Sequence, residues 1–394
     1  MSRIPFENSK FEKVRIRFLI SEKTKSKIQV GDAKPKDEAQ YPFFTSGENI
    51  LSFDKFLCDN QTIFLNTGGN ASVKFYDGKA SYSTDTYAIK SKNENFYLTK
   101  FLFYCLNDTK FMNDIYFEGS ALKHLQKNKF KNFKIPLPPL NEQKKIAEFL
   151  DKKCEKIDKR LNNLERKIKS LKEYKKSLIS ECVTKGLNPK NREFKDSQIP
   201  WIGQIPKHWE ISKIKYVAKI RSENSSFNAE NDKYIGLENV AGYLNSLIET
   251  NTEYENSIQA VCKKGDILFG KLRPYLSKVI VAPFNCFCSS EFLQFINLKC
   301  YFKFFYYFLL NKNFIENVNS STYGAKMPRA NSNYIMNLNF LVPPLNEQKE
   351  IAEFLDKKCE KIDRLNENYT KQITALKEYK KSLIYECVTG KKEI

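Results

Sequence analysis

This chain of 394 residues is poor in the side chains that usually hold metal ions. It contains 2 histidines, and among its 10 cysteines Cys286 and Cys288 alone are closely spaced, inside an apolar stretch. Zinc sites need clustered Cys, His or carboxylate ligands, and metal-dependent nucleases need clustered carboxylates. We therefore predict no metal site and no metal-dependent chemistry in this chain.

Nucleotide-binding motifs are also missing. The sequence has no GxxxxGK[ST] loop, and no glycine fingerprint follows a strand and opens a helix. Because neither ATP hydrolysis nor cofactor binding has support, we predict that the chain is not an enzyme.

Long apolar segments are absent as well. The first residues, MSRIPFENSK, show no apolar signal region, and no apolar run reaches membrane-spanning length. We expect a cytoplasmic protein with no membrane partner, in which the cysteines stay reduced.

Positive charge, by contrast, is abundant. The chain has 66 Lys and Arg against 46 Asp and Glu, a formal charge of +20, which suits a polyanionic partner. Nucleic acid is the first candidate and an acidic membrane surface the second, while a basic surface that serves only solubility stays open. The length, with 41% hydrophobic residues, predicts at least two folded domains.

An internal repeat organises the chain. Residues 138–184 read PPLNEQKKIAEFLDKKCEKIDKRLNNLERKIKSLKEYKKSLISECVT, and residues 343–389 read PPLNEQKEIAEFLDKKCEKIDRLNENYTKQITALKEYKKSLIYECVT. The copies align without a gap and differ mostly between Lys159 and Ser170. The prolines hold an extended start, and Asn141 or Asn346 is predicted to cap the helix that follows.

Each copy then shows the apolar spacing of a coiled-coil seam, by threes and fours. A helix over 142–184 would be roughly 60 Å long and unstable alone, so we expect the copies to pair. We favour antiparallel pairing, because the globular segment after the first helix must lead the chain back. The alternative is that each helix packs on its own domain. The predicted seam residues are Ile146, Leu150, Cys154, Ile157, Leu161, Leu164, Ile168, Leu171, Leu178 and Cys182 in the first copy, and Ile351, Leu355, Ile362, Tyr369, Ile373, Leu376 and Leu383 in the second.

The chain outside the repeat divides into two segments of similar length and faint sequence similarity. Aromatic and β-branched runs in QTIFLNTGGNASVKFYDGKASYSTDTYAI and GDILFGKLRPYLSKVIVAP predict strands, and 98–106 and 302–310 predict helices. The predicted fold class is α+β: two globular domains of mixed strands and helices joined by two long helices in an antiparallel coiled coil. The predicted parts are a first domain over 1–137, a helical segment over 138–189, a second domain over 190–342 and a second helical segment over 343–394.

Polar turns in both domains are candidates for contact with nucleic acid. Gly permits close backbone approach, Lys and Arg neutralise phosphate, and Asn or Arg can pair with base edges. His124 and Arg329 hold matching positions after Gly119 and Gly324. Each turn can also be a simple hairpin, and that alternative stays open. The predicted DNA-binding residues are Thr67, Gly68, Gly69, Asn70, Lys74, Lys79, Tyr82, Lys123 and His124 in the first domain, and Gly270, Lys271, Arg273, Tyr275, Ser289, Ser290, Lys326 and Arg329 in the second.

Taken together, these features resemble the specificity subunit of type I restriction-modification systems over essentially the whole length. The resemblance rests on PPLNEQ followed by IAEFLD, KID and LKEYKKSLI in both copies, and on DSQIPWIGQIPKHWE and GDILFGKLRPYLSK in the second half. The first domain departs from the pattern, because it lacks a counterpart of the lead from Trp201 to Trp209.

The resemblance implies that each domain is a target-recognition domain that reads one half of a split, asymmetric site on double-stranded DNA. It implies that the repeated helices set the gap between the half-sites and help to dock two modification subunits, and that two restriction subunits complete the complex. S-adenosylmethionine, ATP and Mg²⁺ are expected on these partner subunits and not on this chain. The alternative function is a non-catalytic scaffold or an antirestriction decoy without specific DNA reading.

Overall fold

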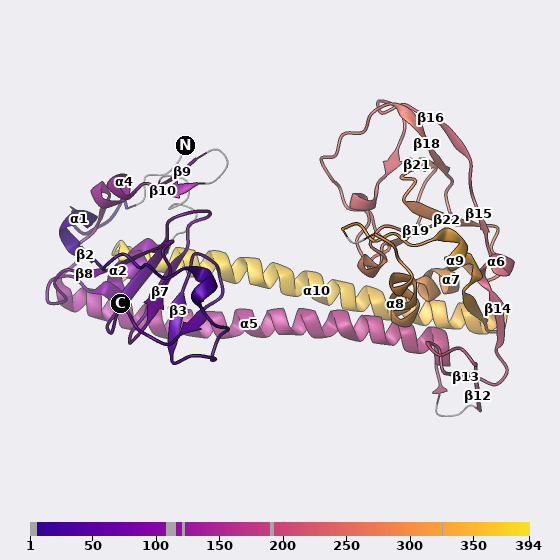
Figure 1. Cartoon of the computed structure of the whole chain (residues 1–394), viewed down its shortest axis with the longest axis horizontal. Coiled ribbons are helices and arrows are strands. Elements are labelled where there is room, and N and C mark those ends of the chain that lie inside the picture. The colour runs from indigo at the N-terminus through magenta and orange to yellow at the C-terminus, as the bar shows by residue number, and fades with distance from the viewer. Residues whose placement is uncertain (1–5, 108–115, 120–122, 190–192, 325) are drawn as a thin grey trace. The chain divides into compact units, whose positions relative to one another are not determined.

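The computed structural model describes residues 6–107, 116–119, 123–189, 193–324 and 326–394 (Figure 1). The chain forms two compact units, one of Met1–Leu164 with Thr370–Ile394 and the other of Glu165–Tyr369. Each unit therefore combines one globular domain with parts of both long helices.

The two long helices carry the sequence repeat: α5 spans Leu140–Lys185 and α10 spans Leu345–Val388. Each helix begins one residue before the asparagine that was predicted to cap it. Asn141 and Asn346 therefore lie inside the first turn, and the capping prediction is wrong.

A glutamine in each PPLNEQ segment fastens the start of the helix to the domain instead. The Gln143 side chain accepts a hydrogen bond from the Leu98 backbone N–H at 2.8 Å, and Gln348 accepts one from the Tyr301 N–H at 2.7 Å. Each amide also donates to the carbonyl oxygen of the first proline of its own segment, at 2.9 and 2.8 Å. Both glutamines are buried, where an amide without partners would be costly. The motif thus sets the direction in which each helix leaves its domain.

The aspartate of each IAEFLD segment makes a second fastening. Asp151 accepts a hydrogen bond from the Tyr104 hydroxyl and lies 3.0 Å from the Lys100 ammonium. Asp356 accepts one from the Tyr307 hydroxyl at 2.7 Å and pairs with a lysine of the same short helix at 2.5 Å. Tyrosine and lysine come from matching helices of the two domains, so the repeat is docked in the same way twice.

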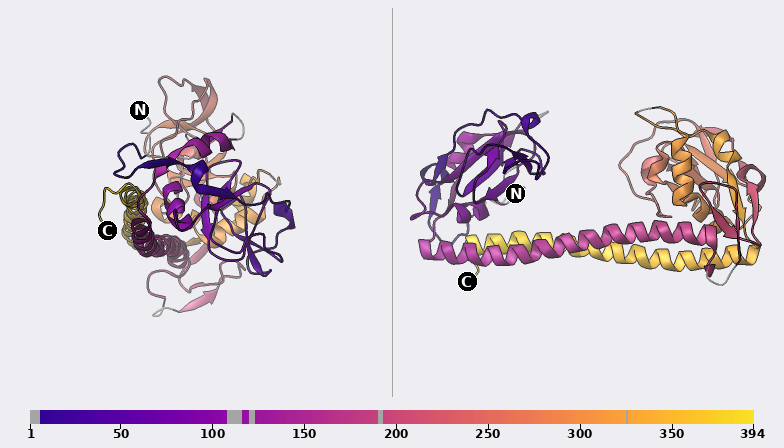
Figure 2. Two further views of the ribbon diagram at one scale, coloured as in Figure 1. Left: turned by 90° about the vertical axis from the view of Figure 1, so that its left-hand side faces the viewer. Right: turned by 60° about the horizontal axis from the view of Figure 1, so that its bottom comes forward.

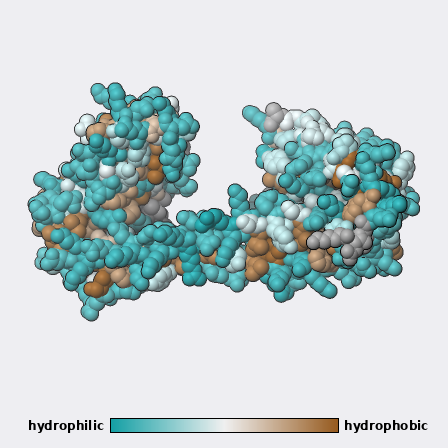
Figure 3. Space-filling model, turned by 90° about the horizontal axis from the view of Figure 1, so that it is seen from below, coloured by the Kyte–Doolittle hydropathy of each residue, from teal (hydrophilic) through white to brown (hydrophobic). Residues whose placement is uncertain are grey.

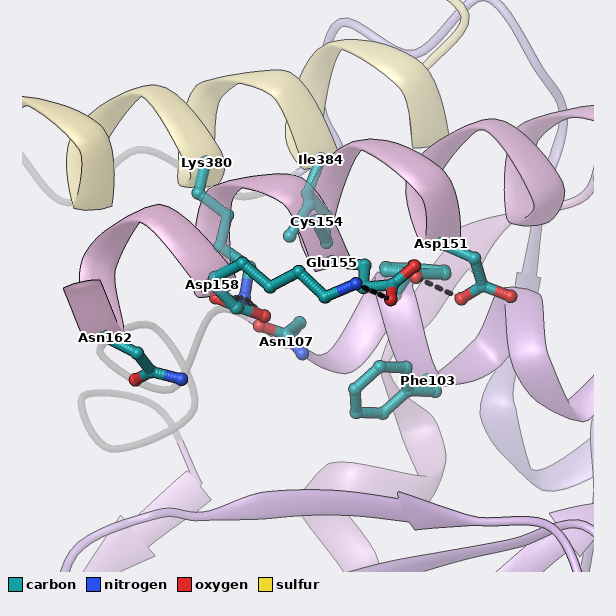
Figure 4. A pocket seen from close by; sticks show the side chains of 11 residues that line it. Phe103, Asn107, Asp151, Cys154, Glu155, Asp158, Asn162, Lys380 and Ile384 are labelled. Atoms are coloured by element: carbon teal, nitrogen blue, oxygen red, sulfur yellow. Dashed lines mark hydrogen bonds and ion pairs between the residues drawn. The ribbon is translucent and has the colours of Figure 1, made fainter.

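Within each unit, α5 and α10 run antiparallel, side by side (Figures 1 and 2). In the first unit the Lys380 ammonium bonds both carboxylate oxygens of Asp158, at 2.6 and 2.7 Å (Figure 4). In the second unit Lys175 bonds both oxygens of Asp363 at 2.7 Å. Asp158 and Asp363 hold the same repeat position, as do Lys175 and Lys380. One ion pair is therefore made twice with the helices exchanged, and the predicted antiparallel coiled coil is confirmed.

The predicted seam packs on the partner helix and on a globular domain at the same time. Pairing of the two helices and packing of each helix on a domain are therefore both correct. Burying such side chains stabilises each unit by roughly 1.5–3 kcal/mol per large residue. The core of the first unit joins Ile146, Leu150, Cys154, Ile157 and Leu161 of α5 with Leu383, Ile384, Cys387 and Val388 of α10 and with domain residues such as Phe101 and Leu102. The core of the second unit joins Ile351, Ala352, Leu355 and Cys359 of α10 with Ile179, Cys182 and Val183 of α5 and with domain residues such as Phe304 and Phe308.

The buried stripe is wider than the predicted seam. Ile179 and Val183 are fully buried although they lie outside that seam, whereas Leu178 inside it is half-buried. A helix that touches a domain as well as a partner helix must bury more than a two-residue heptad seam. Half-buried seam residues also include Ile168, Leu171, Tyr369, Ile373 and Leu376.

The first domain is a mixed fold built on a four-stranded sheet of order β2-β8-β5-β6 and a three-stranded sheet of order β4-β3-β7. A short pair, β1 with β11, leads the chain into α5. The elements are β1 Lys13–Arg15, α1 Ile16–Leu19, β2 Ile20–Glu22, η1 Val30–Asp32, β3 Tyr41–Phe44, β4 Leu51–Phe53, β5 Thr62–Asn66, β6 Val73–Tyr76, β7 Ser81–Tyr82, β8 Thr86–Ser91, α2 Thr99–Leu106, β9 Phe117–Glu118, β10 His124–Leu125, α4 Lys127–Asn132 and β11 Lys134–Pro136.

The second domain repeats the first of these sheets and the pair that leads into the long helix, but its other sheet has four strands in a different order. Its sheets have the orders β15-β22-β19-β20 and β16-β18-β21-β17, and the pair β14 with β23 leads into α10. Two domains with faint sequence similarity thus share the topology of one four-stranded sheet, while their other sheets differ in strand number and order. The predicted α+β class is confirmed. The elements are β12 Phe194–Asp196, β13 Gln204–Pro206, β14 Glu210–Lys213, α6 Ile214–Val217, β15 Lys219–Ile220, β16 Asn224–Phe227, β17 Tyr234–Ile235, η3 Leu237–Asn239, β18 Ser257–Cys262, β19 Ile267–Gly270, η4 Pro274–Leu276, β20 Val279–Val281, β21 Cys286–Cys288, β22 Phe292–Ile296, α7 Phe302–Leu309, α8 Lys312–Ser320, α9 Ser332–Asn337 and β23 Asn339–Val342.

The tryptophan-containing lead of the second domain has a structural role. The buried Trp209 indole donates to the Glu347 carboxylate at 3.1 Å, and His208 Nε2 lies 2.8 Å from the same oxygen. Glu142, the matching residue of the first repeat, is exposed. The difference agrees with the lack of such a lead in the first domain.

The two ion pairs give a matched stability test. Asp363→Ala should lower the free energy of unfolding by about 3 kcal/mol, because the Lys175 side chain, 7% exposed, would be left charged and buried. Asp158→Ala should cost about 1 kcal/mol or less, since the Lys380 side chain is 25% exposed and water can replace the carboxylate. Urea unfolding of the full chain, with hydrogen exchange resolving the two units, measures both. Equal costs would contradict this reading of the two pairs.

Candidate nucleic-acid interface

The predicted polar turns occupy matching places in the two domains. We define loop A as residues 67–72, which join β5 to β6 in the first domain, and 271–278, which join β19 to β20 in the second. We define segment B as 123–125 and 328–330, which precede α4 and α9. Strands β5 and β19 hold the same place in their sheets, so the two loops leave equivalent edges of the fold.

Backbone hydrogen bonds join loop A to segment B in the first domain. The Gly69 N–H donates to the Lys123 carbonyl at 2.8 Å, and the Leu125 N–H donates to the Thr67 carbonyl at 3.0 Å. Gly69 has a φ of 80°, which a residue with a side chain rarely adopts. The glycine in this turn therefore serves the backbone path that brings His124 next to Gly68.

The second domain repeats these bonds with other side chains. The Arg273 N–H donates to the Pro328 carbonyl at 2.7 Å, and the Ala330 N–H donates to the Lys271 carbonyl at 3.0 Å. Leu272 lies opposite Arg329, as Gly68 lies opposite His124. The sequence-based match of His124 with Arg329 thus corresponds to one structural position.

A third segment completes the arrangement, and sequence reasoning missed it. The Thr67 N–H donates to the Asp85 carbonyl at 3.0 Å, and the Lys271 N–H donates to the Glu291 carbonyl at 2.8 Å. These acidic residues directly precede β8 and β22. A carboxylate therefore stands at the same place beside loop A in both domains, and no motif in the sequence marks it.

Asn66 shapes loop A of the first domain and was also missed. It is 2% exposed; its amide nitrogen donates to the carbonyl oxygens of Gly68, at 2.8 Å, and Asn70, and its amide oxygen accepts from the Ser72 N–H at 2.7 Å. A buried amide with all these partners fixes the turn from inside. The only sequence signal was a polar residue at the end of an apolar strand.

Loop A of the second domain is held by backbone geometry of a different kind. Arg273 and Ser277, with φ near 52°, flank the short helix η4 in the left-handed region, which is unfavourable for residues with a side chain. Tyr275 and Leu276, 52% and 41% exposed, protrude between them. The Arg273 Nε is buried and has no hydrogen-bond partner among the described residues. Such an N–H is costly unless a ligand or water completes it.

The basic side chains Lys271 and Lys74, beside loop A, are partly buried and interact with other groups of the protein. Burial lowers the pKa of Lys271, an effect that Glu291 opposes and Arg329 increases. The Lys74 ammonium donates to the carbonyl oxygens of Thr45, at 3.0 Å, and Gly47, and burial lowers its pKa too. Lys74 is therefore engaged within the first domain.

Two predicted DNA-binding residues belong to the domain interior, and for them the structure corrects the prediction. Tyr82 is 1% exposed, its hydroxyl donates to the Thr24 carbonyl at 2.6 Å, and burial raises its pKa to about 12. Gly270 is buried in β19, where an added Cβ would lie 3.0 Å from Leu237 and 3.4 Å from Lys278. Packing, and not access to a ligand, accounts for both residues.

The other predicted residues differ in their surroundings. Lys79 lies in the β6–β7 turn, away from loop A in sequence, with its ammonium 4.9 Å from the Phe56 ring centroid. Ser289 is half-buried and its hydroxyl accepts from the Glu291 N–H at 3.2 Å, while Ser290 is exposed. Among the predicted residues, the exposed ones in loop A and segment B are Asn70, Lys123, His124, Tyr275 and Arg329, and Lys326 is exposed just before segment B.

Other kinds of site find little support in the part of the chain that the structure describes. There, no group of three or more His, Cys, Asp or Glu side chains is placed to hold a metal ion. None of the described helices is long and apolar enough to cross a membrane, and the face in Figure 3 is mostly hydrophilic.

Comparisons with known proteins match the doubled architecture. The family model described as type I restriction modification DNA specificity domain matches residues 8–170 and 206–375. The MjaVIII type I restriction enzyme specificity subunit of Methanocaldococcus jannaschii is 29% identical over 350 residues, covering 84% of this chain and 79% of the relative. The EcoDI specificity subunit of Escherichia coli is 24% identical over 381 residues, covering 91% and 84%.

A solved structure supports the same fold. A chain from work on complex assembly and conformational transition of the type I R-M system matches with a TM-score of 0.66 at 16% identity, covering 96% of this chain and 97% of that chain. Two domains built on the same four-stranded sheet, each with loop A joined to segment B, define a recognition protein with a doubled binding unit. The chain belongs to the family of type I restriction-modification DNA specificity proteins, whose domain it carries twice. It is a non-catalytic DNA sequence-recognition subunit.

The role of Asn66 can be tested directly. Asn66→Ala should speed hydrogen exchange of the Ser72 amide and the rest of loop A by roughly tenfold. The reason is that the variant loses the hydrogen bonds of the buried Asn66 amide to the loop backbone, which contribute about 1–2 kcal/mol. Mass spectrometry of peptides covering 66–76 measures this. The matched control is Asn70→Ala, which removes an exposed side chain and should leave exchange unchanged. Similar exchange in both variants would show that Asn66 does not shape the loop.

Proposed function

We propose that each domain reads one half of a bipartite, asymmetric DNA site through loop A and segment B. One observation carries the proposal: both domains join these two segments by the same backbone hydrogen bonds while presenting different side chains. The same frame with different chemistry suits two half-sites of different sequence.

The side chains of the second domain favour contact with phosphates and base edges. Lys271 and Arg329 lie near Glu291, and Arg273 stands on the same loop A, so these segments carry three basic side chains. Cations supply non-specific attraction to the DNA backbone, and an arginine fork can pair with the guanine edge in the major groove. In the first domain Asn70, Lys123 and His124 provide an amide for adenine and basic groups for phosphates.

Arg273 gives the first test of the proposal. Arg273→Ala should weaken binding to the recognised duplex by about 1–3 kcal/mol and relax reading of one half-site, because a half-buried arginine on loop A can pair with a base edge through its guanidinium. The recognised site is obtained by sequencing methylated bases in cells with and without this chain. Binding to that site and to random duplex is then measured with the modification subunits present.

A matched arginine provides the control. Arg364 lies on α10, 76% exposed, and pairs only along its own helix with Glu360 at 2.6 Å. Arg364→Ala should change both affinities little. If Arg273→Ala loses the same affinity for specific and for random DNA, Arg273 contacts phosphates and does not read a base. If the wild-type chain shows no sequence preference, the proposed function itself is overturned.

We propose further that the subunit assembles with two modification subunits and two restriction subunits. Tyr174 and Tyr379 support a paired partner: they hold the same position in the identical LKEYKKSLI segments, and they are 53% and 52% exposed. One lies in each unit. S-adenosylmethionine, ATP and Mg²⁺ would be bound by those partners.

The stoichiometry has its own test. Tyr174→Ala and Tyr379→Ala should each remove one modification subunit from the complex, and the double variant should remove both, because an exposed aromatic ring is a common anchor of protein interfaces. Native mass spectrometry of the reconstituted complex counts the subunits. Phe18→Ala, which removes an aromatic ring 62% exposed on α1, is the control. Two bound subunits in the double variant would exclude this surface.

A further inference from the structure

A single acidic side chain holds one arginine at the interface of the second domain. The Glu291 Oε1 accepts a hydrogen bond from the Arg329 Nη2, and the two side chains are 21% and 46% exposed. The Glu291 backbone carbonyl also holds loop A through the Lys271 N–H at 2.8 Å. Glu291 therefore links the strand β22, loop A and segment B.

The surroundings of this pair are polar and incompletely bonded. The Glu291 Oε2 and the Arg273 Nε are both buried without hydrogen-bond partners among the described residues. Lys271 lies close enough to both Glu291 and Arg329 for each to affect its pKa. Glu291 thus holds Arg329 through one carboxylate oxygen, and its other oxygen has no hydrogen-bond partner among the described residues.

The first domain shows that the frame does not require such a pair. Asp85 and His124 hold the positions of Glu291 and Arg329, with the same backbone bond from loop A. Both are exposed, and no ion pair between them is found in the described part of the chain. The Glu291–Arg329 pair is therefore specific chemistry of the second domain and not a structural need of the fold.

We infer that Glu291 is a positioning residue that orients the Arg329 guanidinium to read a guanine in the second half-site. This inference rests on the proposed function. An arginine fork discriminates guanine only if its plane is fixed, and a carboxylate on Nη2 fixes it while leaving other N–H groups free. The negative charge also repels phosphates, so the same carboxylate weakens binding to random DNA.

The test separates these two effects. In the full chain with its modification subunits, Glu291→Gln should bind random duplex several-fold more tightly, and its specific-to-random affinity ratio should fall about tenfold. Glu291→Asp keeps the negative charge on a shorter side chain. It should therefore still bind random DNA weakly, but its specific-to-random affinity ratio should lie below that of wild type, because the shorter side chain holds Arg329 less well. A structural role alone would not move the two affinities in opposite senses.

A modified base supplies a second readout. Replacing the read guanine by 7-deazaguanine removes the N7 acceptor, so it should weaken wild-type binding and leave the affinity of Glu291→Gln nearly unchanged. Glu360→Gln is the matched control, because Glu360 also pairs with an arginine Nη2 but on α10. It should behave as wild type.

The outcomes distinguish this inference from the proposed function. If wild type discriminates its site and Glu291→Gln keeps the same ratio, the inference is overturned and the proposed function stands. If Glu291→Gln lowers the ratio by the same factor in an Arg329→Ala background, Glu291 does not act through Arg329 and the inference is again overturned. No discrimination by wild type would reject both.

Discussion

The lysine–aspartate pair between the long helices is the constraint on which the rest of the structure depends. Lys175 is almost fully buried, so any shift in helix register would leave its charge without the Asp363 carboxylate. Breaking such a pair costs far more than the pair itself contributes, which makes it a device for specifying register. Since Lys380 and Asp158 repeat the pair, one register satisfies both units.

This exchange explains why the two helical copies are so alike at their ends. Each unit packs the beginning of one copy against the end of the other, and against a domain. The beginning must carry the glutamine and aspartate that bind the domain, and the end must carry the lysine that meets the aspartate of the partner helix. Both copies therefore need the same residues at both ends. Most of the differences fall between Lys159 and Ser170, outside these contacts.

Sequence reasoning reached the long helices and their pairing because heptad spacing and a gapless repeat are strong, local signals. It made the seam too narrow, since nothing in the periodicity of α5 reveals that Ile179 and Val183 meet a domain from the other half of the chain. It singled out polar turns in what became loop A and segment B, but it could not show that the two segments are joined. Asn66, which bonds its own loop, and Glu291, which bonds an arginine 38 residues away, carried no motif. Tyr82 was misjudged because an aromatic residue between polar neighbours can face either way on a strand.

The hydrogen bonds that join loop A to segment B are made by backbone groups, which residues of many types can supply. The path of the two segments therefore does not depend on the side chains that would contact DNA. In the first domain the frame carries Thr67, Gly68 and His124, and in the second it carries Lys271, Leu272 and Arg329. Because the frame is indifferent to these side chains, their chemistry can differ completely between the domains without loss of the fold. A protein that reads two unlike half-sites needs this independence, and it also accounts for domains that share a four-stranded sheet and its loops while sharing little sequence.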